Sequence, residues 1–360
     1  MVPSTEGKGE RAGTQRLRHD AVRARRQDHP RCTGWFAWRP DRVGPLRGRT
    51  QRSGTGLIVF VSLIAVLLAS QSPVRAACEV QERAEVPFTA TGGQLLVPLV
   101  VNGTPANFVM DTGAERSLVT PDAVRRLGLP LDQWVGTTMH GVGGVVEHQN
   151  ADPRSLTLGG VTLQRHTITH DTSLTVGPLP EPGAGTPLDG LLGRDFLSVF
   201  DLQLDMAAHR LTLYNVQGCS GRFLPWTAPY ASVPVVTPMT HALILPITLD
   251  SHRLTALLDT GASTTVIALP GMIKLGVTRE SLAGDQASAA RGVGRQSPEM
   301  HRHRFGILQI GSETESNPML WVAPVRLTPI VDALLGADWL MAQRRVWLSF
   351  ATSQVFFQRQ

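Results

Sequence analysis

The sequence predicts a mostly β protein made of two similar lobes. Three observations support this: the tripeptide Asp-Thr-Gly occurs at residues 111–113 and again at 259–261, each copy follows strand-like apolar runs, and each precedes a second shared motif. That motif reads Leu-Leu-Gly-Arg-Asp-Phe-Leu at 191–197 and Leu-Leu-Gly-Ala-Asp-Trp-Leu at 334–340. Two motifs repeated in the same order indicate a duplicated unit rather than chance.

Apolar strands are expected before each tripeptide. The first lobe has a turn at Asn102-Gly103, a dipeptide typical of tight hairpins. Each half also ends in two alternating segments, the pattern of half-buried antiparallel strands. The strand-like runs are residues 95–101, 108–110, 201–205 and 210–214 in the first half, and 243–249, 256–258, 346–350 and 354–357 in the second.

Short surface helices are expected at 121–127 and 270–275. Each begins with a Pro, which suits the first turn of a helix, and each ends at a Gly, Gly128 or Gly276, which suits the residue after a helix. The sequence offers no long helix, so the fold class is mostly β. We divide the chain into a basic leader (1–56), a signal-peptide core and cleavage region or membrane anchor (57–76), an N-terminal lobe (84–216), a linker (217–234) and a C-terminal lobe (235–360).

The charge of the chain is concentrated at its start. The 360 residues carry a formal charge of +5, and the first 52 hold a clear excess of Lys and Arg. A basic protein can bind nucleic acid, but this segment lacks interleaved aromatic residues and heptads. We therefore expect no nucleic-acid partner.

Residues 57–69 form an uncharged apolar run behind the basic segment. The run is shorter than the roughly 20 residues that span a membrane, and small residues follow it, as in a signal peptide. We expect export, to the periplasm or outside the cell. A cleaved signal peptide and a retained anchor in the inner membrane are both open.

Two cysteines, Cys78 and Cys219, lie in the part of the chain expected to be exported, whereas Cys32 lies in the leader. A pair of cysteines in an oxidising compartment can form a disulfide. Two unrelated thiols and a lipid-modified Cys78 are the alternatives.

The duplicated aspartates, Asp111 and Asp259, have the chemistry for hydrolysis if they face each other. Two carboxyl groups about 3 Å apart cannot both ionise, so they share one proton and supply an acid and a base at the same pH. Such a pair can activate a water molecule for attack on an amide. It requires no metal, no cofactor and no nucleophilic side chain.

With its Asp-Thr-Gly-Ala segments, its Gly-Val-Gly turns and its Leu-Leu-Gly-x-Asp-(Phe/Trp)-Leu segments, the chain resembles retropepsin-like aspartic proteases of the bacterial aspartyl protease type. The resemblance covers residues 86–360 and has both lobes in one chain, as in pepsin. It implies two β-barrel-like lobes of the acid protease fold, with an active-site cleft between them. It also implies an endopeptidase that takes peptide or protein substrates, and we expect a monomer because both lobes are present.

The resemblance assigns roles to individual residues. Asp111 and Asp259 would be the catalytic pair, Thr112 and Thr260 would hold the two turns together, and Gly113 and Gly261 would let each turn expose its Asp. Leu192-Gly193 and Leu335-Gly336 would back the turns. The flap tips over the substrate would be Gly141, Val142, Gly143 and Gly144 in the first lobe and Gly292, Val293 and Gly294 in the second.

The two halves differ beside each aspartate. The first has Glu115 and Arg194, for which the resemblance predicts an ion pair, whereas the second has Ser263 and an uncharged Ala337. Arg295, at the place of Gly144 in the other half, puts symmetric closure of the flaps in doubt. Trp134, Val142 and Val293 indicate pockets for apolar side chains.

Two other functions compete with proteolysis. A catalytically silent module of the same fold could bind peptides or a protein partner. A hydrolytic metal site could use histidines, but His166 and His170 would lie about 13 Å apart on a strand, and His301 and His303 have no evident third ligand. We therefore predict no metal.

Overall fold

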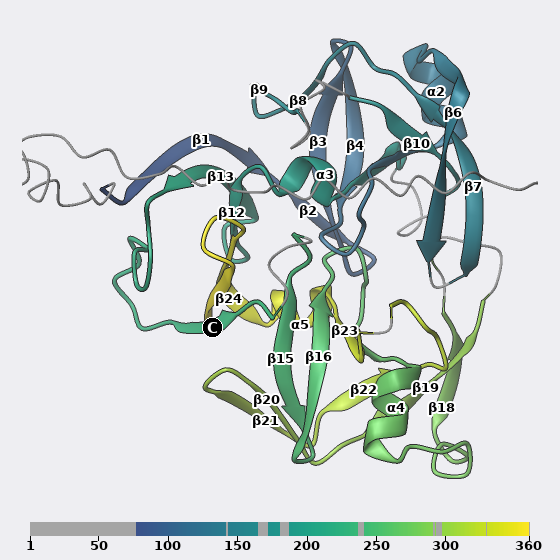
Figure 1. The fold of residues 1–360 in the computed structure, drawn as a ribbon, viewed down its shortest axis with the longest axis vertical. Helices are drawn as coiled ribbons and strands as arrows, with labels where there is room; N and C mark the ends of the chain where they lie inside the picture. Colours follow the sequence, from purple (N-terminus) through teal and green to yellow (C-terminus); the bar gives the residue numbers. More distant parts are fainter. Residues whose placement is uncertain are drawn as a thin grey trace, which may run out of the picture. The chain divides into compact units, whose positions relative to one another are not determined.

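The computed structural model describes residues 77–141, 143–164, 172–180, 187–236, 241–290, 292, 297–328 and 330–359. These residues belong to one compact unit, Ser72–Gln360. Their strands form three sheets, one in each lobe and one shared by both (Figure 1). The predicted mostly β fold with two similar lobes is therefore confirmed.

The first-lobe sheet has the strand order β6-β7-β10-β5-β11-β4-β3-β8-β9, and β2 pairs with β3. At its centre β11 runs parallel to β4 and antiparallel to β5. The strands are β2 (Thr89–Thr91), β3 (Gln94–Val101), β4 (Thr104–Met110), β5 (Leu118–Val119), β6 (Leu131–Gly141), β7 (Gly144–Ala151), β8 (Leu156–Leu158), β9 (Val161–Thr162), β10 (Leu174–Val176) and β11 (Gly190–Leu192).

The second-lobe sheet repeats this topology, in the order β18-β19-β22-β17-β23-β16-β15-β20-β21. Here β23 takes the place of β11, because it runs parallel to β16 and antiparallel to β17. The strands are β15 (Ile244–Leu249), β16 (His252–Leu258), β17 (Val266–Ile267), β18 (Gln286–Ala289), β19 (Glu299–Arg304), β20 (Ile307–Ile310), β21 (Glu313–Ser316), β22 (Met319–Val322) and β23 (Ala333–Leu335).

The described helices are short and occur in equivalent pairs. They are α2 (Pro121–Leu127) and α3 (Arg194–Leu197) in the first lobe, and α4 (Leu269–Leu275) and α5 (Ala337–Met341) in the second. Helices α2 and α4 confirm the predicted ones. Each ends at a left-handed glycine, Gly128 (φ 60°) or Gly276 (φ 67°), and the hydroxyl of Thr120 accepts a hydrogen bond at the start of α2.

A six-stranded sheet joins the two halves of the chain. Its order is β1-β13-β12-β24-β25-β14, so β12 from the first half pairs with β24 from the second. The strands are β1 (Glu79–Pro87), β13 (Arg210–Gln217), β12 (Asp201–Asp205), β24 (Gln343–Ser349), β25 (Gln354–Arg359) and β14 (Ala231–Pro234). The halves therefore share a continuous hydrogen-bonded sheet.

The segment expected as a linker, 217–234, is more ordered than the sequence indicates. Its last residues form β14 at the edge of the shared sheet, where a proline is tolerated. Before β14, Trp226 packs with Trp347 and Phe356 in one buried cluster. The indole Nε1 of Trp226 donates a hydrogen bond to Gln203 Oε1 at 2.7 Å. The linker thus covers and extends the shared sheet.

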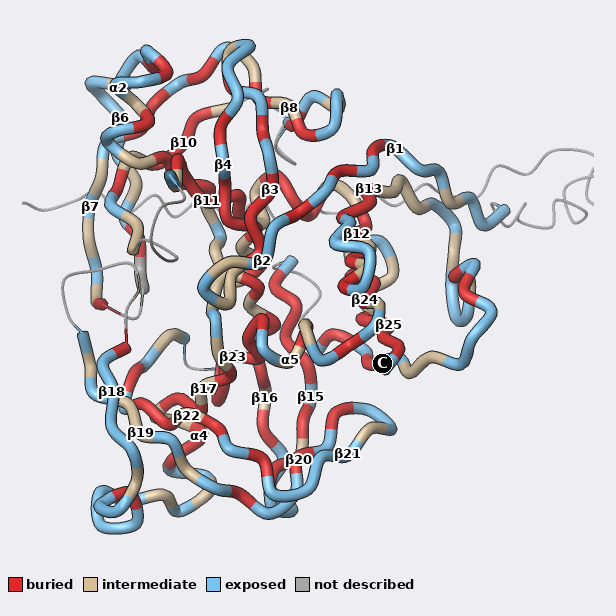
Figure 2. The backbone as a smooth tube through the Cα atoms, turned by 180° about the vertical axis from the view of Figure 1, so that it is seen from behind, coloured by how far each residue is buried: buried red, intermediate tan, exposed pale blue. Residues whose placement is uncertain are grey.

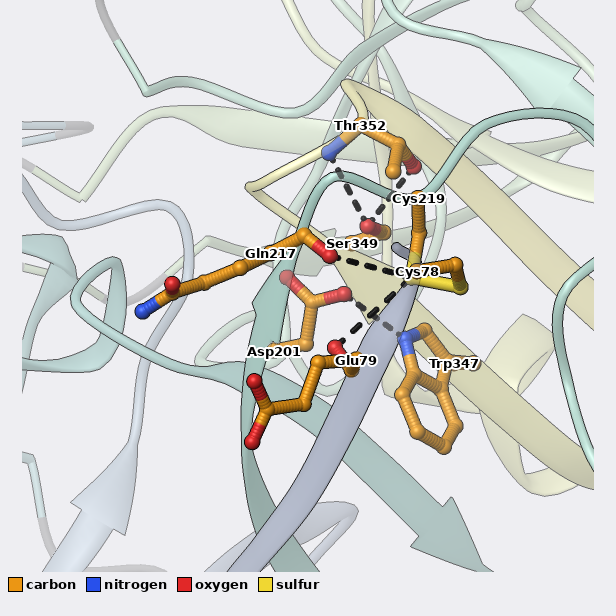
Figure 3. Close-up of a disulfide and its surroundings, with 8 residues drawn as sticks. All are labelled: Cys78, Glu79, Asp201, Gln217, Cys219, Trp347, Ser349 and Thr352. Carbon is orange, nitrogen blue, oxygen red and sulfur yellow. Dashed lines mark hydrogen bonds between the residues drawn. A yellow bond between two sulfur atoms is a disulfide. The ribbon is translucent and has the colours of Figure 1, made fainter. Parts of the chain in front are cut away.

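Cys78 and Cys219 form a disulfide, with their Cα atoms 4.3 Å apart. Figure 3 shows it next to Glu79 and Gln217, where β1 begins and β13 ends. The bond fixes the outer strand β1 to the end of its neighbour. The sulfur of Cys78 is therefore not available for a lipid in this structure.

The buried residues form one large apolar cluster that includes strands of all three sheets. Figure 2 shows buried stretches along the central strands of both lobes and along the shared sheet. Among the described residues, no helix is both long and apolar enough to cross a membrane. The apolar run 57–69 lies outside the described residues.

Candidate active site

Asp111 and Asp259 occupy equivalent positions, each directly after a central strand. Asp111 follows β4, and its backbone N–H donates to Leu192 O at 2.9 Å. Asp259 follows β16, and its N–H donates to Leu335 O, also at 2.9 Å. The two Leu-Leu-Gly motifs therefore lie behind the two Asp-Thr-Gly turns.

Each turn binds its own carboxylate with backbone N–H groups. Asp111 Oδ1 accepts from Ala114 N at 2.8 Å. Asp259 Oδ1 accepts from Gly261 N and from Ala262 N, both at 3.0 Å. Such bonds fix the orientation of each carboxyl group and favour its ionised form.

The two turns face each other so closely that each Asp lies against the glycine of the other lobe. A Cβ atom added to Gly113 would lie 2.4 Å from Asp259 Cγ, and one added to Gly261 would lie 2.3 Å from Asp111 Cγ. Only glycine fits at these two positions. The two carboxyl groups are close enough that each changes the pKa of the other, which a shared proton requires.

Thr112 and Thr260 are fully buried and cross-link the turns. The N–H of each donates to the hydroxyl of the other, at 3.0 and 3.1 Å. Each hydroxyl in turn donates to the opposite lobe, to Leu258 O at 2.7 Å and to Met110 O at 2.6 Å. These four bonds hold the two aspartates in one site.

Both aspartates have a raised pKa, for partly different reasons. Burial raises the pKa of Asp259 well above its ordinary value, and the charge of Asp111 raises it further. Burial also raises the pKa of Asp111, but the N–H of Ala114, the hydrogen bond from Asp259 and the charge of Arg194 oppose this rise. The pair therefore binds a proton more tightly than an ordinary exposed Asp does.

The Glu115–Arg194 interaction is electrostatic rather than a close ion pair. Burial lowers the pKa of Arg194, and the charge of Glu115 raises it. The contacts within 4.0 Å between described residues do not include a direct bond between these side chains, so the predicted ion pair is not formed here. In the second lobe Ser263 is exposed, and Ala337 is buried.

A hydroxyl and a carboxylate support each turn from behind, and the sequence motifs assigned them no role. Ser117 donates to Asp195 Oδ1 at 2.7 Å, and Thr265 donates to Asp338 Oδ1 at 2.7 Å. Each hydroxyl also accepts the N–H of the glycine in Leu-Leu-Gly, at 2.8 and 3.1 Å. Ser117 and Thr265 come equally far after their aspartates, a repeat that could have identified them.

A second unpredicted support comes from Gln94, the first residue of β3. Its side-chain Nε2 donates to the carbonyl oxygen of Gly261, in the other lobe, at 3.0 Å. The contact joins residues far apart in the sequence and belongs to neither repeated motif. No sequence signal pointed to it.

Both predicted flaps contain a β-hairpin. Strands β6 and β7 pair up to Gly141 and Gly144, and β18 pairs with β19 up to Ala289 and Glu299. The two hairpins lie along the same edge of the unit (Figures 1 and 2). Gly143 and Gly292 are described, whereas Val142, Val293, Gly294 and Arg295 lie outside the described residues.

A cavity of about 810 Å³ lies beside the first turn and the base of the β6–β7 hairpin. Its lining is mostly polar. Trp134, expected in an apolar pocket, is 93% exposed and does not line it. The lining residues are Arg116, Asp132, Val135, Gly136, Thr137, Thr138, Asn150, Asp152, Thr172 and Ser173.

Of the histidines that could be metal ligands, His301 and His303 lie on β19, and each has a different acidic neighbour. His303 Nδ1 lies 2.6 Å from Asp285 Oδ2, and His301 Nε2 lies 3.8 Å from Glu299 Oε2. His166 and His170 lie outside the described residues.

The chain matches the model of one protein family twice. The family is described as an aspartyl protease, and the matches cover residues 97–196 and 245–339. Together they span more than half of the chain, and each contains one Asp-Thr-Gly turn and its Leu-Leu-Gly motif.

One similar solved structure is the crystal structure of an aspartic proteinase from Irpex lacteus. It is 14% identical in sequence, with a TM-score of 0.47, and the alignment covers 78% of this chain and 98% of that chain. No protein among the curated ones matches the sequence.

Proposed function

Because this chain belongs to the aspartyl protease family, we propose that it is an endopeptidase in which Asp111 and Asp259 activate a water molecule. One observation carries the proposal. Each carboxyl group lies against the glycine of the opposite turn, and each changes the pKa of the other. This arrangement supports a pair that acts as acid and base at the same pH.

In the proposed reaction, ionised Asp111 removes a proton from water while the water oxygen attacks the peptide carbonyl carbon. Asp259, which holds the shared proton, donates it to the carbonyl oxygen, so a neutral diol forms. Asp111 then gives its proton to the peptide nitrogen, and the C–N bond breaks. The diol returns a proton to Asp259, and the pair regains its starting state.

The substrate of this proposal is an extended peptide that adds as a strand beneath the β6–β7 and β18–β19 hairpins. The polar cavity beside the first turn would receive a side chain away from the reacting bond. Its lining favours a polar or charged residue at that position of the substrate. Since both halves of the site come from one chain, a monomer suffices for activity.

The experiment compares cleavage of a denatured, labelled protein from pH 3 to pH 7. We expect cleavage by the parent protein and a loss of at least a thousandfold in Asp259→Asn, because this variant cannot supply the shared proton in the same way. Asp250→Asn is the matched control. Asp250 belongs to the same lobe, and an Asn there keeps the oxygen that accepts from Gly306 N and Ile307 N.

Two results would contradict the proposal. Undiminished cleavage by Asp259→Asn would remove Asp259 from the chemistry. An inactive parent protein that still binds denatured peptides would instead favour the silent binding module of the same fold.

We also propose that the chain is exported, with 57–69 acting as a signal peptide or anchor. The Cys78–Cys219 disulfide supports this, because such bonds persist in oxidising compartments. Sequencing the N-terminus of the mature protein checks it. A start shortly before Cys78 is expected after cleavage, a start before residue 57 would indicate a retained anchor, and a reduced protein in the cytoplasm would contradict export.

A further inference from the structure

Gln94 holds one specific peptide unit of the second active-site turn. Its Nε2 donates to the carbonyl oxygen of Gly261 at 3.0 Å. The same peptide unit carries the N–H of Ala262, which donates to Asp259 Oδ1 at 3.0 Å. A hydrogen bond accepted at the carbonyl polarises the peptide and makes its N–H a better donor. Gln94 therefore acts on Asp259 through one rigid, planar amide.

Within the described part of the chain, the amide of Gln94 makes a hydrogen bond through its nitrogen but not through its oxygen. Its Oε1 is buried and has no hydrogen-bond partner among the described residues. A buried acceptor without a partner destabilises the folded state. The opposite orientation of the amide would place Oε1 against the Gly261 carbonyl oxygen, so the contact requires the donor at this end.

Among the described residues, the first turn shows no side-chain donor to the Gly113 carbonyl oxygen that would be equivalent to this contact. Ala114 N donates to Asp111 Oδ1 at 2.8 Å, as in the second lobe. The residue equivalent to Gln94, equally far before Asp259, is Ala242, and a methyl group cannot donate to the Gly113 carbonyl. The charge of Arg194, from the first lobe, acts on both Asp111 and Asp259. The two turns thus share a backbone frame but receive different side-chain support.

The hairpin that carries Gln94 is fitted to the second turn. Gly93 lies between β2 and β3 with φ +77°, and a Cβ atom added there would lie 2.8 Å from Ser263 Cβ. A larger residue would push the hairpin away from the turn. The position of Gln94 therefore depends on Gly93 as well as on its own side chain.

We propose that Gln94 is a positioning residue of the active site, which reaches across the lobes to orient the Gly261–Ala262 peptide and thereby the carboxyl group of Asp259. The inference deepens the proposed function and rests on it for its kinetic part.

The proposal predicts the direction of a change in titration. Loss of the Gln94 contact weakens the N–H bond to Asp259 Oδ1, which favours the ionised carboxylate, so the last proton of the pair should leave at a higher pH. The ionisable groups that act on Asp259 are Asp111 and Arg194, and the substitutions below leave both unchanged. We expect an upward shift of about half a pH unit.

The test titrates the carboxyl carbons of Asp111 and Asp259 by ¹³C NMR in the full protein, without substrate. Gln94→Met keeps the length of the side chain and removes the donor. Gly93→Ala keeps the Gln94 side chain but displaces the hairpin that carries it. Gly103→Ala is the matched control, because Gly103 also has a positive φ, +83°, in the next hairpin, and nothing lies within 4 Å of an added Cβ.

We expect the upper apparent pKa of the pair to rise in Gln94→Met and in Gly93→Ala and to stay unchanged in Gly103→Ala. With a denatured, labelled protein as substrate, kcat should fall about threefold in Gln94→Met, with KM unchanged. An unshifted titration in Gln94→Met, an equal shift in Gly103→Ala, or a Gln94→Met variant that does not fold would each overturn the proposal.

The titration separates this proposal from the proposed function. If the parent protein cleaves nothing but Gln94→Met still shifts the titration, the positioning role holds and the protease is rejected. If the parent protein is active but Gln94→Met leaves the titration unshifted, the protease holds and the positioning role of Gln94 is rejected.

Discussion

Single residues make the two halves of the site unequal. The backbone bonds around Asp111 and Asp259 are nearly the same, but the surroundings differ at equivalent positions. Arg194 in the first lobe corresponds to Ala337 in the second, and Gln94 corresponds to Ala242. Burial raises the pKa of both aspartates; the charge of Arg194 opposes this rise at Asp111, and the charge of Asp111 adds to it at Asp259. The proposed roles of acid and base rest on these differences.

The buried threonines offer a test of how the turns are held. Thr112→Val removes the hydroxyl that donates to Leu258 O and accepts from Thr260 N. Since both groups are buried, we expect the free energy of unfolding to fall by about 2–5 kcal/mol. Urea unfolding measures it. Thr112→Ser keeps the hydroxyl and should stay within about 1 kcal/mol of the parent; a loss as large as that of the Val variant would contradict the role of the hydrogen bonds.

At the scale of elements, the shared six-stranded sheet decides how the halves are joined. Strand β12 carries Asp201, which is only 2% exposed. Its carboxyl oxygens accept from Trp347 Nε1 and from Ala351 N, both at 3.0 Å, and so join the two halves. Figure 3 shows the bond to Trp347. Burial raises the pKa of Asp201 above its ordinary value of 3.8, although these bonds oppose the rise.

The raised pKa of Asp201 makes the sheet more stable in acid. Because the folded state binds this proton more tightly than the unfolded state, the contribution is fully present below pH 3.8 and is lost as the pH rises through the higher folded pKa. We expect the free energy of unfolding, measured in urea from pH 3 to pH 8, to fall less with rising pH in Asp201→Asn than in the parent. Parallel curves would contradict this.

At the scale of the whole molecule, the duplication explains what the sequence could predict. Strands β3, β4, β15 and β16 and helices α2 and α4 have strong local signals, because apolar runs, prolines and glycines act within a few residues. The facing of the two Asp-Thr-Gly turns was predictable from their repetition together with the family resemblance. None of these features depends on a particular side-chain contact between the lobes.

The features that the sequence did not reveal depend on contacts across the chain. Residues 231–234 have many turn-forming neighbours, and only pairing with β25 makes them a strand. The sequence around Gln94 does not indicate its contact with Gly261, because the two residues lie 167 positions apart. Glu115 and Arg194 fit the pattern of an ion pair, yet they interact only through their charges, without a contact within 4.0 Å between the described side chains.

The most direct test asks whether Asp111 and Asp259 act as one unit. The measurement is the rate of cleavage of a denatured protein by Asp111→Asn, Asp259→Asn and the double variant at one acidic pH. Because a shared proton requires both carboxyl groups, all three variants should show the same residual rate, at least a thousandfold below the parent. A single variant that keeps more than a tenth of the parent rate, or losses that multiply in the double variant, would contradict the account.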